Sequence, residues 1–304
     1  MLIVGGTGFI GKYTVKEALA LGFQVTIISK NHKAPSERIK DVEYLLIDIS
    51  KKDKLYNQLK DKAFHYVINL GGYVDHSNYS SGGEEVVDTH FNGTKNLINC
   101  INKDSLRSFI QIGSSDEYGA NLAPQNESQR ESPISPYSFA KTSATHFLQM
   151  LYKTEHFPVV ILRPFLVYGP GQSMERFIPQ IISGCIEGRN FPTSEGRQLR
   201  DFCFIGDFIQ SIFSSIDNTE VFGEVINIAS GEPISIKDVV TIIQNIISTG
   251  RPQFGKVAYR TGENMELYAD ITKAKKLLNW QPEVSLEEGL KKTIDSIRDL
   301  SDAG

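Results

Sequence analysis

Two residues at a helical spacing have the chemistry to move a proton. Tyr137 and Lys141 stand four positions apart in the segment 137–155, which predicts a helix, so their side chains share one face. A lysine cation beside a phenol favours the phenolate and lowers the tyrosine pKa from about 10 toward neutrality. Such a pair donates and accepts a proton. The chain has 12 tyrosines, so a Tyr-x-x-x-Lys match can also arise by accident.

A glycine-rich loop follows the first predicted strand, residues 2–4, and opens a predicted helix over 8–21. Its sequence is Gly5-Gly6-Thr7-Gly8-Phe9-Ile10-Gly11. Gly5 permits the tight turn, Gly8 lets a pyrophosphate approach the backbone, and Gly11 lets the helix pack on the strand. The loop therefore predicts a dinucleotide site at a helix N-terminus, and the alternative is a tight turn without a ligand.

The residues near the end of the second predicted strand indicate which dinucleotide binds. An NAD site places a carboxylate about 20 residues beyond the glycines, but here Ser29-Lys30 stands at this point. A hydroxyl and a cation suit the 2′-phosphate of NADP, so NADP(H) is favoured and NAD(H) stays possible. The alternative is that Lys30 is a solvated loop lysine. Asp48, after the third strand, is a candidate acceptor for the adenine amino group or a helix N-cap. The remaining candidate cofactor contacts are Thr7, Phe9, Ile10, Ile49 and Leu70.

Strands and helices alternate through the first half of the chain. The predicted strands are 2–4, 23–29, 42–47, 66–69, 109–112 and 158–163, and the predicted helices are 8–21, 50–62, 84–103 and 137–155. This βαβ order predicts an α/β fold: a doubly wound parallel Rossmann sheet with helices on both faces. A ligand is expected at the carboxyl ends of its strands.

The second half of the chain is richer in Pro and Gly and predicts a smaller lobe. Strand-like segments at 199–205 and 223–228 surround a helix at 207–217, and helices follow at 235–247, 271–278 and 286–299. We expect residues 1–165 to form the dinucleotide-binding core, with 199–230 returning to it. Residues 166–198 and 231–304 then form a smaller C-terminal α/β lobe that binds the substrate.

Composition excludes several classes of function. Hydrophobic residues make up 40% of the 304, which excludes a disordered chain, and the net charge of −4 gives no basic surface for nucleic acid or an anionic membrane. The three cysteines are too few and scattered for disulfides or zinc, and no metal site is expected. No apolar run approaches the roughly 18 residues of a membrane span. Because the first strand begins at Met1, we expect no signal peptide and a cytoplasmic location.

Several ordered motifs add to the glycine loop and the Tyr137/Lys141 pair. The chain resembles the extended short-chain dehydrogenase/reductases that modify nucleotide sugars, grouped as NAD-dependent epimerases and dehydratases. The motifs are Asn92-Gly93-Thr94, Arg163-Pro164-Phe165, Val167-Tyr168-Gly169-Pro170-Gly171, Arg200-Asp201-Phe202, Ala269-Asp270-Ile271-Thr272-Lys273-Ala274 and Leu278-Asn279-Trp280-Gln281-Pro282. The resemblance covers nearly the whole chain.

The resemblance implies further site residues. Ser114 completes a catalytic triad with Tyr137 and Lys141 by hydrogen-bonding the sugar O4. The family's 4,6-dehydratases follow this hydroxyl with Asp-Glu, whereas the gapless match here reads Ser114-Ser115-Asp116 and lacks the general acid. An alignment shifted by one residue restores the triplet as Ser115-Asp116-Glu117. Ser115 and Asp116 are candidate substrate contacts in either case.

Two arginines match those that hold the substrate pyrophosphate in relatives. They are Arg200 and Arg260, and two guanidinium groups suit a diphosphate. The alternative is that they form surface ion pairs. His76 is the one histidine in a loop expected near the nicotinamide, where it is a loop residue or a substrate contact. The resemblance also implies a homodimer, formed by the helices at 84–103 and 137–155.

The expected reaction is an NADP-dependent reduction of the C4 keto group of a nucleotide-linked 4-keto-6-deoxyhexose. Tyr137 protonates the emerging alkoxide, Ser114 orients it, and Lys141 holds the nicotinamide ribose and tunes the phenol. The first alternative is a 4-epimerase or 4,6-dehydratase that recycles a tightly held NAD. The second is a nucleotide sensor of the same fold without catalysis. The nucleotide-diphosphate sugar is the expected partner.

Overall fold

A seven-stranded parallel sheet forms the centre of the molecule. The computed structural model describes residues 1–31, 34, 36, 38–259 and 262–302. The strand order is β11-β6-β5-β4-β1-β2-β3, and every neighbouring pair is parallel. The strands are β1 (Leu2–Val4), β2 (Val25–Ser29), β3 (Val42–Leu46), β4 (Tyr66–Asn69), β5 (Ser108–Ile112), β6 (Val159–Pro164) and β11 (Val225–Ile228). The predicted doubly wound Rossmann sheet is confirmed.

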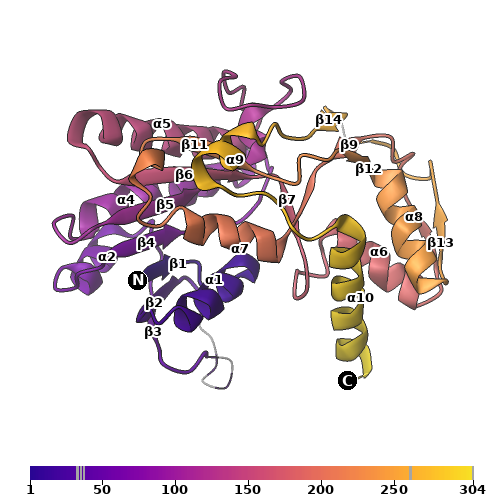
Figure 1. Cartoon of the computed structure of the whole chain (residues 1–304), viewed down its shortest axis with the longest axis horizontal. Helices are drawn as coiled ribbons and strands as arrows, with labels where there is room; N and C mark the ends of the chain where they lie inside the picture. Colours follow the sequence, from indigo (N-terminus) through magenta and orange to yellow (C-terminus); the bar gives the residue numbers. More distant parts are fainter. Residues whose placement is uncertain (32–33, 35, 37, 260–261, 303–304) are drawn as a thin grey trace.

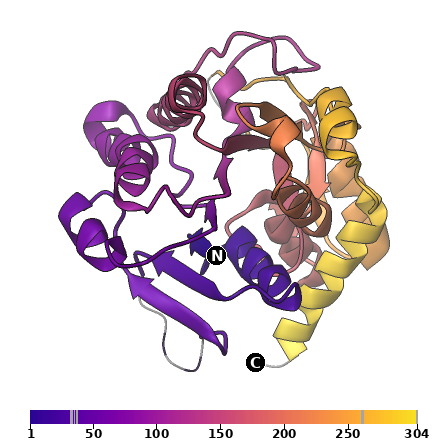
Figure 2. The ribbon, with the colours of Figure 1, turned by 60° about the vertical axis from the view of Figure 1, so that its left-hand side comes forward.

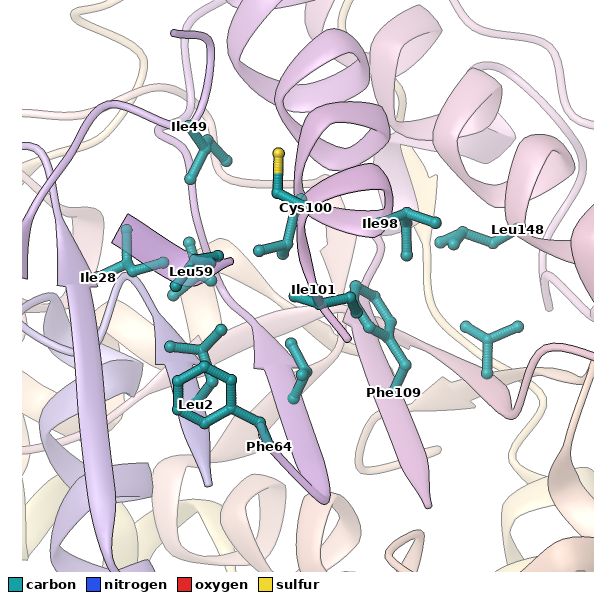
Figure 3. Close-up of a cluster of buried hydrophobic side chains, with 14 of the residues drawn as sticks. Leu2, Ile28, Ile49, Leu59, Phe64, Ile98, Cys100, Ile101, Phe109 and Leu148 are labelled. Carbon is teal, nitrogen blue, oxygen red and sulfur yellow. The ribbon is translucent and has the colours of Figure 1, made fainter. Parts of the chain in front are cut away.

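Alternating side chains place one core on each face of this sheet. Leu2 and Val4 point into the cluster under one layer of helices, whereas Ile3 between them points into the cluster on the other face. Figure 3 shows the first cluster, where Leu59, Ile98 and Leu148 come down from three helices onto the strands. Because both faces are covered, the strands are continuous apolar runs rather than alternating ones.

The helices form two layers around the sheet (Figures 1 and 2). One layer holds α2 (Lys52–Leu59), α4 (Gly93–Cys100) and α5 (Pro136–Glu155). The other holds α1 (Phe9–Ala20), α7 (Ile205–Ser214) and α9 (Thr272–Leu278). The sequence predicted α1, α2, α5, α7 and α9 within a few residues of their ends.

The helix predicted over 84–103 is interrupted by a wider turn. It consists of α3 (Gly83–Val87), a π-helical turn η3 (Asp88–Asn92) and α4. Such π turns often occur at functional sites. Here the turn carries His90, which is 4% exposed.

The smaller lobe packs three helices around short strands. The helices are α6 (Phe177–Ile186), α8 (Ile236–Ile247) and α10 (Leu286–Asp302), and they share one apolar core with Tyr168 and Phe202. The strand pairs are β7 (Leu166–Tyr168) with β10 (Phe202–Phe204), and β8 (Asn190–Pro192) with β13 (Arg251–Gln253). A third small sheet orders β12 (Ile234–Ser235), β9 (Leu199–Arg200) and β14 (Glu266–Leu267).

The segment 199–230 divides between the two parts of the molecule. Its last strand, β11, pairs with β6 at the edge of the central sheet, which is the core to which this segment was expected to return. Its first strands, β9 and β10, pair instead within the small sheets. Conversely, part of the segment 231–304, predicted for the smaller lobe, belongs to the core. Its helix α9 packs on β11, and Ala274, Leu278 and Trp280 belong to a core cluster of the central sheet.

One helix in this region differs from the sequence expectation. The helix α6 was not predicted from the sequence, because Pro179 and Gly184 interrupt its pattern. A proline in the first turn of a helix lacks only an N–H that has no partner there, so α6 tolerates it.

In the described part of the chain, no helix is long and apolar enough to cross a membrane.

Candidate active site

The glycine loop lies between β1 and α1, where the strand order reverses and β1 pairs with both β2 and β4. Gly5 has a positive φ of 79°, and a Cβ on Gly11 would lie 2.2 Å from the Gly5 carbonyl oxygen, so the fold itself requires both glycines. At Gly8 the nearest atom to a Cβ would be 3.4 Å away. The protein's own packing therefore does not require Gly8, whose backbone is open to a ligand.

The start of α1 suits an anion. Gly8 is the N-cap and provides no side-chain cap for the helix, so the first-turn amides are available to phosphate oxygens. Phe9 and Ile10 turn their side chains into the core cluster under α1 and contribute their backbone to this turn. The residues present therefore fit the pyrophosphate of a dinucleotide.

The polar residues at the adenosine end are already paired. Ser29 Oγ lies 3.0 Å from Thr7 Oγ1, and Lys30 Nζ lies 3.4 Å from Asp48 Oδ2. The other Asp48 oxygen accepts the Ser50 amide at 2.9 Å, which closes a turn ahead of α2, although Lys51 holds the N-cap position. The Asp48 carboxylate offsets the Lys30 cation, which weakens the sequence argument for a 2′-phosphate.

Hydrophobic residues from the next two loops line the same region. Leu70 follows β4, and a Cβ on Gly5 would lie 2.9 Å from the Leu70 carbonyl oxygen. The Ile49 side chain lies against both Gly71 and Gly93. The predicted contacts Ile49 and Leu70 therefore lie in the loops that border the glycine turn.

The predicted triad comes together at the carboxyl end of β5. Ser114 follows this strand, and its hydroxyl is near enough to the Tyr137 phenol to lower the phenol's pKa. Tyr137 and Lys141 lie on α5, where Pro136 at the first position and a Ser135 cap fix the helix start. Lys141 Nζ lies 5.9 Å from the centre of the Tyr137 ring and donates to the Ile112 carbonyl oxygen at 2.8 Å.

The electrostatics of the pair differ from the sequence expectation. Burial raises the pKa of Tyr137 above its usual range, and the hydrogen bond to Ser114 lowers it only in part. Lys141 is not among the main causes of this shift. Instead burial lowers the pKa of Lys141 itself, to about 8. The expected lowering of the Tyr137 pKa toward neutrality is therefore wrong for the protein alone, because desolvation of a 6% exposed phenol outweighs the cation.

The turn after Ser114 separates the two carboxylates that follow. Ser114 caps the short helix η4 (Ser115–Tyr118) and accepts the Asp116 amide at 3.2 Å. Glu117 points into the core with 0% exposure. Its Oε1 accepts the Ser114 amide at 2.8 Å, and its Oε2 accepts Arg163 Nη2 at 2.7 Å.

Glu117 has a structural role in this turn. It is held by buried contacts to Ser114 and Arg163, and its charge, like that of Asp116, raises the pKa of Tyr137. Ser115, which takes the place of the dehydratase acid in the gapless alignment, is buried at 4% exposure. The shifted triplet Ser115-Asp116-Glu117 stays an alternative.

Two histidine rings pack against Tyr137. The His76 ring lies 5.6 Å from the Tyr137 ring, edge to face, and its Nε2 lies 3.6 Å from Asp116 Oδ2. The His90 ring lies 5.1 Å from the Tyr137 ring at an angle of 86°. Its Nε2 lies 2.8 Å from the Tyr73 carbonyl oxygen and 3.3 Å from the Tyr73 amide nitrogen.

His90 was missed by the sequence analysis. Burial and the Lys141 charge lower its pKa to about 3, so the ring is neutral. A Cβ on Gly72 would lie 2.0 Å from the ring, and this glycine therefore makes room for it. The only signal in the sequence is the position of His90 one helical turn before Thr94 of the Asn-Gly-Thr motif, which does not indicate contact with Tyr137.

The smaller lobe contributes arginines to the same site. Arg200, on β9, is 9% exposed; it donates to the Leu199 carbonyl oxygen at 2.7 Å and pairs with Glu263. Arg176, the N-cap of α6, is exposed, and its positive charge acts to lower the pKa of both Tyr137 and Asp116. The sequence analysis did not select it. Arg260 lies outside the described residues, so its predicted role stays a prediction.

A parallel Rossmann sheet, a glycine turn at its topological switch point and a Ser-Tyr-Lys triad beside it together define an extended short-chain dehydrogenase/reductase. Residues 1–229 match the family model described as NAD dependent epimerase/dehydratase family. The chain belongs to this family.

Similar proteins carry out different reactions. The chain is 29% identical over 321 residues to UDP-N-acetyl-alpha-D-glucosaminuronate decarboxylase of Bacillus cytotoxicus, covering 98% of each chain. It is 26% identical over 328 residues to dTDP-glucose 4,6-dehydratase of Haemophilus influenzae, covering 97% of this chain and 96% of the relative. It is also 29% identical to the crystallised UDP-glucuronic acid 4-epimerase of Bacillus cereus, in complex with UDP-glucuronic acid and NAD, with a TM-score of 0.86 over 98% of this chain and 99% of that one.

Proposed function

We propose that this protein is an NAD-dependent 4-epimerase of a nucleotide-linked hexose. One observation carries the proposal: the Ser114 hydroxyl acts on the Tyr137 phenol, Lys141 Nζ lies 5.9 Å from the centre of the same ring, and the gapless alignment puts Ser115 where a dehydratase has its carboxylic acid. The site thus has the groups for proton transfer at O4 and lacks the acid for loss of water at C6. The relationship to nucleotide-sugar enzymes supports the choice of substrate.

Each residue of the triad has a distinct task. The bound dinucleotide supplies the acceptor and donor of hydride at C4. Tyr137 Oη takes the proton of the sugar 4-hydroxyl during oxidation and returns it during reduction. Ser114 Oγ hydrogen-bonds the same oxygen and orients it. The Lys141 ammonium favours the phenolate form of Tyr137 at the moment of transfer, against the burial that raises the tyrosine pKa.

The substrate diphosphate is assigned to Arg200. Its guanidinium is nearly buried and pairs with Glu263, and a diphosphate is a doubly charged competitor for the same donors. Binding therefore requires Glu263 to release Arg200.

A second candidate is the reduction of a nucleotide-linked 4-keto-6-deoxyhexose by NADPH. It uses the same triad and is equally compatible with Ser115. The observation that favours it is Ser29-Lys30 at the end of β2, provided that Lys30 leaves Asp48 for a 2′-phosphate. A net reduction consumes NADPH at every turnover, whereas an epimerase regenerates its cofactor, so the two reactions are readily distinguished.

The test combines the cofactor with the products. Purified protein is denatured and the released nucleotide is identified by mass spectrometry. Fresh protein is then incubated with UDP- and dTDP-linked glucose and galactose, or with a 4-keto-6-deoxy derivative and NADPH. Retained NAD and interconversion of the 4-epimers without net absorbance change at 340 nm are the expected results. Stoichiometric loss of NADPH would establish the reductase, and dinucleotide binding without any turnover would leave only a sensor.

Substitution of the phenol tests the assigned proton transfer. Tyr137→Phe removes only the hydroxyl, so we expect normal cofactor affinity and a loss of kcat of at least about 10²-fold. The matched control is Tyr118→Phe, because Tyr118 is equally buried but donates to Asn227 at 2.8 Å. Turnover of Tyr137→Phe at the rate of the unaltered protein would remove the residue from the mechanism.

A further inference from the structure

The carboxylate of Asp116 occupies one wall of the site beside the reacting phenol. The Asp116 amide is fixed by Ser114 Oγ at 3.2 Å, and its Oδ2 lies 3.6 Å from His76 Nε2. The His76 ring contacts Tyr137, with ring centres 5.6 Å apart. Carboxylate, imidazole and phenol therefore lie together, and the Asp116 side chain is 32% exposed toward the opening.

Charged groups from four elements face Asp116. They are His76 from the loop after β4, Glu117 from η4, Arg176 from the N-cap of α6 and Arg200 from β9. Two of these are already engaged, Glu117 by Arg163 and Arg200 by Glu263.

Arg176 is the remaining arginine facing the site, and it is exposed at the start of α6. Lys141 of α5 is a further cation near Asp116, and its Nζ lies 5.9 Å from the centre of the Tyr137 ring. Asp116 is thus the carboxylate of this wall that has His76 as its partner, and His76 is also in contact with the phenol ring.

This charge constrains which sugar the site accepts. When O4 of a hexose reaches Tyr137 and Ser114, the neighbouring substituents at C3 and C5 lie within a few ångström of the same wall. A hydroxyl there can donate a hydrogen bond to a carboxylate, which is a charge-assisted bond. A second carboxylate is repelled, because two like charges at close range disfavour each other.

We propose that Asp116, held by His76, is a specificity-determining residue that selects nucleotide sugars with an uncharged hexose and rejects uronic acids. The inference rests on the proposed function, because it places a sugar C4 at Tyr137. It assigns to Asp116 a role in substrate choice that is separate from the proton transfer at O4.

UDP-glucose and UDP-glucuronic acid are a matched pair of probes, since they differ only at C6. We expect the protein to favour UDP-glucose by at least about 10²-fold in kcat/KM, the size of effect that a like charge produces at close range. In Asp116→Asn the carboxylate is neutralised with its shape retained, so this ratio falls at least about tenfold. Glu175→Gln, which removes an exposed charge next to Arg176, leaves the ratio unchanged.

A second measurement needs no variant. Burial raises the pKa of Asp116, so lowering the pH protonates Asp116 before it protonates a solvated uronic acid. The preference for the neutral sugar therefore narrows as the pH falls. Preferred turnover of UDP-glucuronic acid, or a ratio insensitive to both Asp116→Asn and pH, would overturn the assignment.

Failure of the proposed function is distinguishable from failure of this inference. If neither sugar is converted, equilibrium binding of the same two probes by calorimetry replaces the kinetic ratio. The inference then predicts tighter binding of UDP-glucose and a smaller difference in Asp116→Asn. Equal affinities in the unaltered protein would contradict it.

Discussion

Lys141 and His90 are two buried bases that lie near each other and near Tyr137. Burial lowers the pKa of both, to about 8 for Lys141 and about 3 for His90, and the charge on Lys141 contributes to the lower value. At neutral pH the pair therefore holds a single positive charge, and it is on the lysine. A neutral His90 can pack its ring on Tyr137 without repelling the cation on which the proton transfer depends.

The lowered pKa of Lys141 predicts an alkaline limit to activity. The pH dependence of kcat/KM reports ionisations of the free enzyme, so we expect kcat/KM to fall as the pH rises through about 8, where the ammonium is lost. Arginine keeps its charge to far higher pH than lysine, so in Lys141→Arg the fall of kcat/KM above pH 8 should disappear, even though the variant is slower. If the fall persists unchanged in Lys141→Arg, the ionisation belongs to another group.

The same shift affects stability in the opposite direction. Between about pH 8 and the ordinary lysine pKa of 10.5, the unfolded chain binds more protons at Lys141 than the folded one. The Lys141 contribution to the free energy of unfolding therefore increases with pH over this window. Activity and this contribution to stability thus change in opposite directions, so a fall in kcat/KM there is not evidence of unfolding.

At this scale, the sequence selected three residues that the fold brings together and missed a fourth that packs against them. Ser114, Tyr137 and Lys141 belong to motifs with fixed spacing, and the fold brings them together as expected. The His90 contact depends on a π turn and on the missing side chain of Gly72, and neither is encoded in a periodic pattern. Tertiary packing alone creates this part of the site.

Among the elements, the short helix η4 determines where Ser114 points. Glu117 fixes the position of this helix, because its carboxylate accepts three hydrogen bonds. The donors are the Ser114 amide, Thr145 Oγ1 at 2.9 Å and the Arg163 guanidinium. Arg163 also donates to Glu131 at 2.9 Å and lies 4.4 Å from the centre of the Tyr118 ring. The buried ion pair thus connects β6, α5 and the loop after β5 at the floor of the site.

We expect Glu117→Gln to destabilise the protein by about 3 kcal/mol, since it leaves the buried Arg163 with one carboxylate fewer. Denaturant unfolding measures this loss, and Glu131→Gln, at the more exposed partner, should cost less. If Glu117 were instead a catalytic acid, the variant would lose turnover at unchanged stability. That outcome would favour the shifted alignment Ser115-Asp116-Glu117.

The strands of the central sheet could be predicted from the sequence because most of them bury a short apolar run between glycine and polar turns, although the edge strand β3 is only partly buried. The strands from β1 to β6 lie within two residues of their predicted ends. In the smaller lobe, strands of two or three residues are too short to show a period, and α6 contains Pro179 and Gly184. Among the arginines of this lobe near Asp116, the sequence analysis selected Arg200, which a motif marks, and did not select Arg176.

The whole molecule places its reacting groups where the two parts meet. The dinucleotide turn and the triad come from the central sheet, whereas Arg200 and Arg176 come from elements of the smaller lobe. Asp116 is acted on by both arginines across this junction. On the proposed function, residues of both parts determine substrate choice, whereas the dinucleotide turn belongs to the central sheet alone.

The outer face of the helix layer is where we expect a second copy of the chain to bind. On α5, Phe139, His146 and Met150 recur at intervals of seven and four residues, so they share a face, and all three are exposed, Phe139 by 53% and Met150 by 43%. The neighbouring Phe91 of the π turn packs on Phe147 of α5, with ring centres 6.2 Å apart. This aromatic surface along two helices suits an isologous pairing.

We therefore predict a homodimer that a charge on this face dissociates. Light scattering coupled to gel filtration should give twice the chain mass of 33.9 kDa for the unaltered protein and the single mass for Phe139→Asp with Met150→Asp. Leu122→Asp is the matched control, because Leu122 is 84% exposed but lies outside these helices. Since α5 also carries Tyr137 and Lys141, dissociation should lower turnover as well as mass. A monomeric unaltered protein, or dissociation by Leu122→Asp alone, would refute this interface.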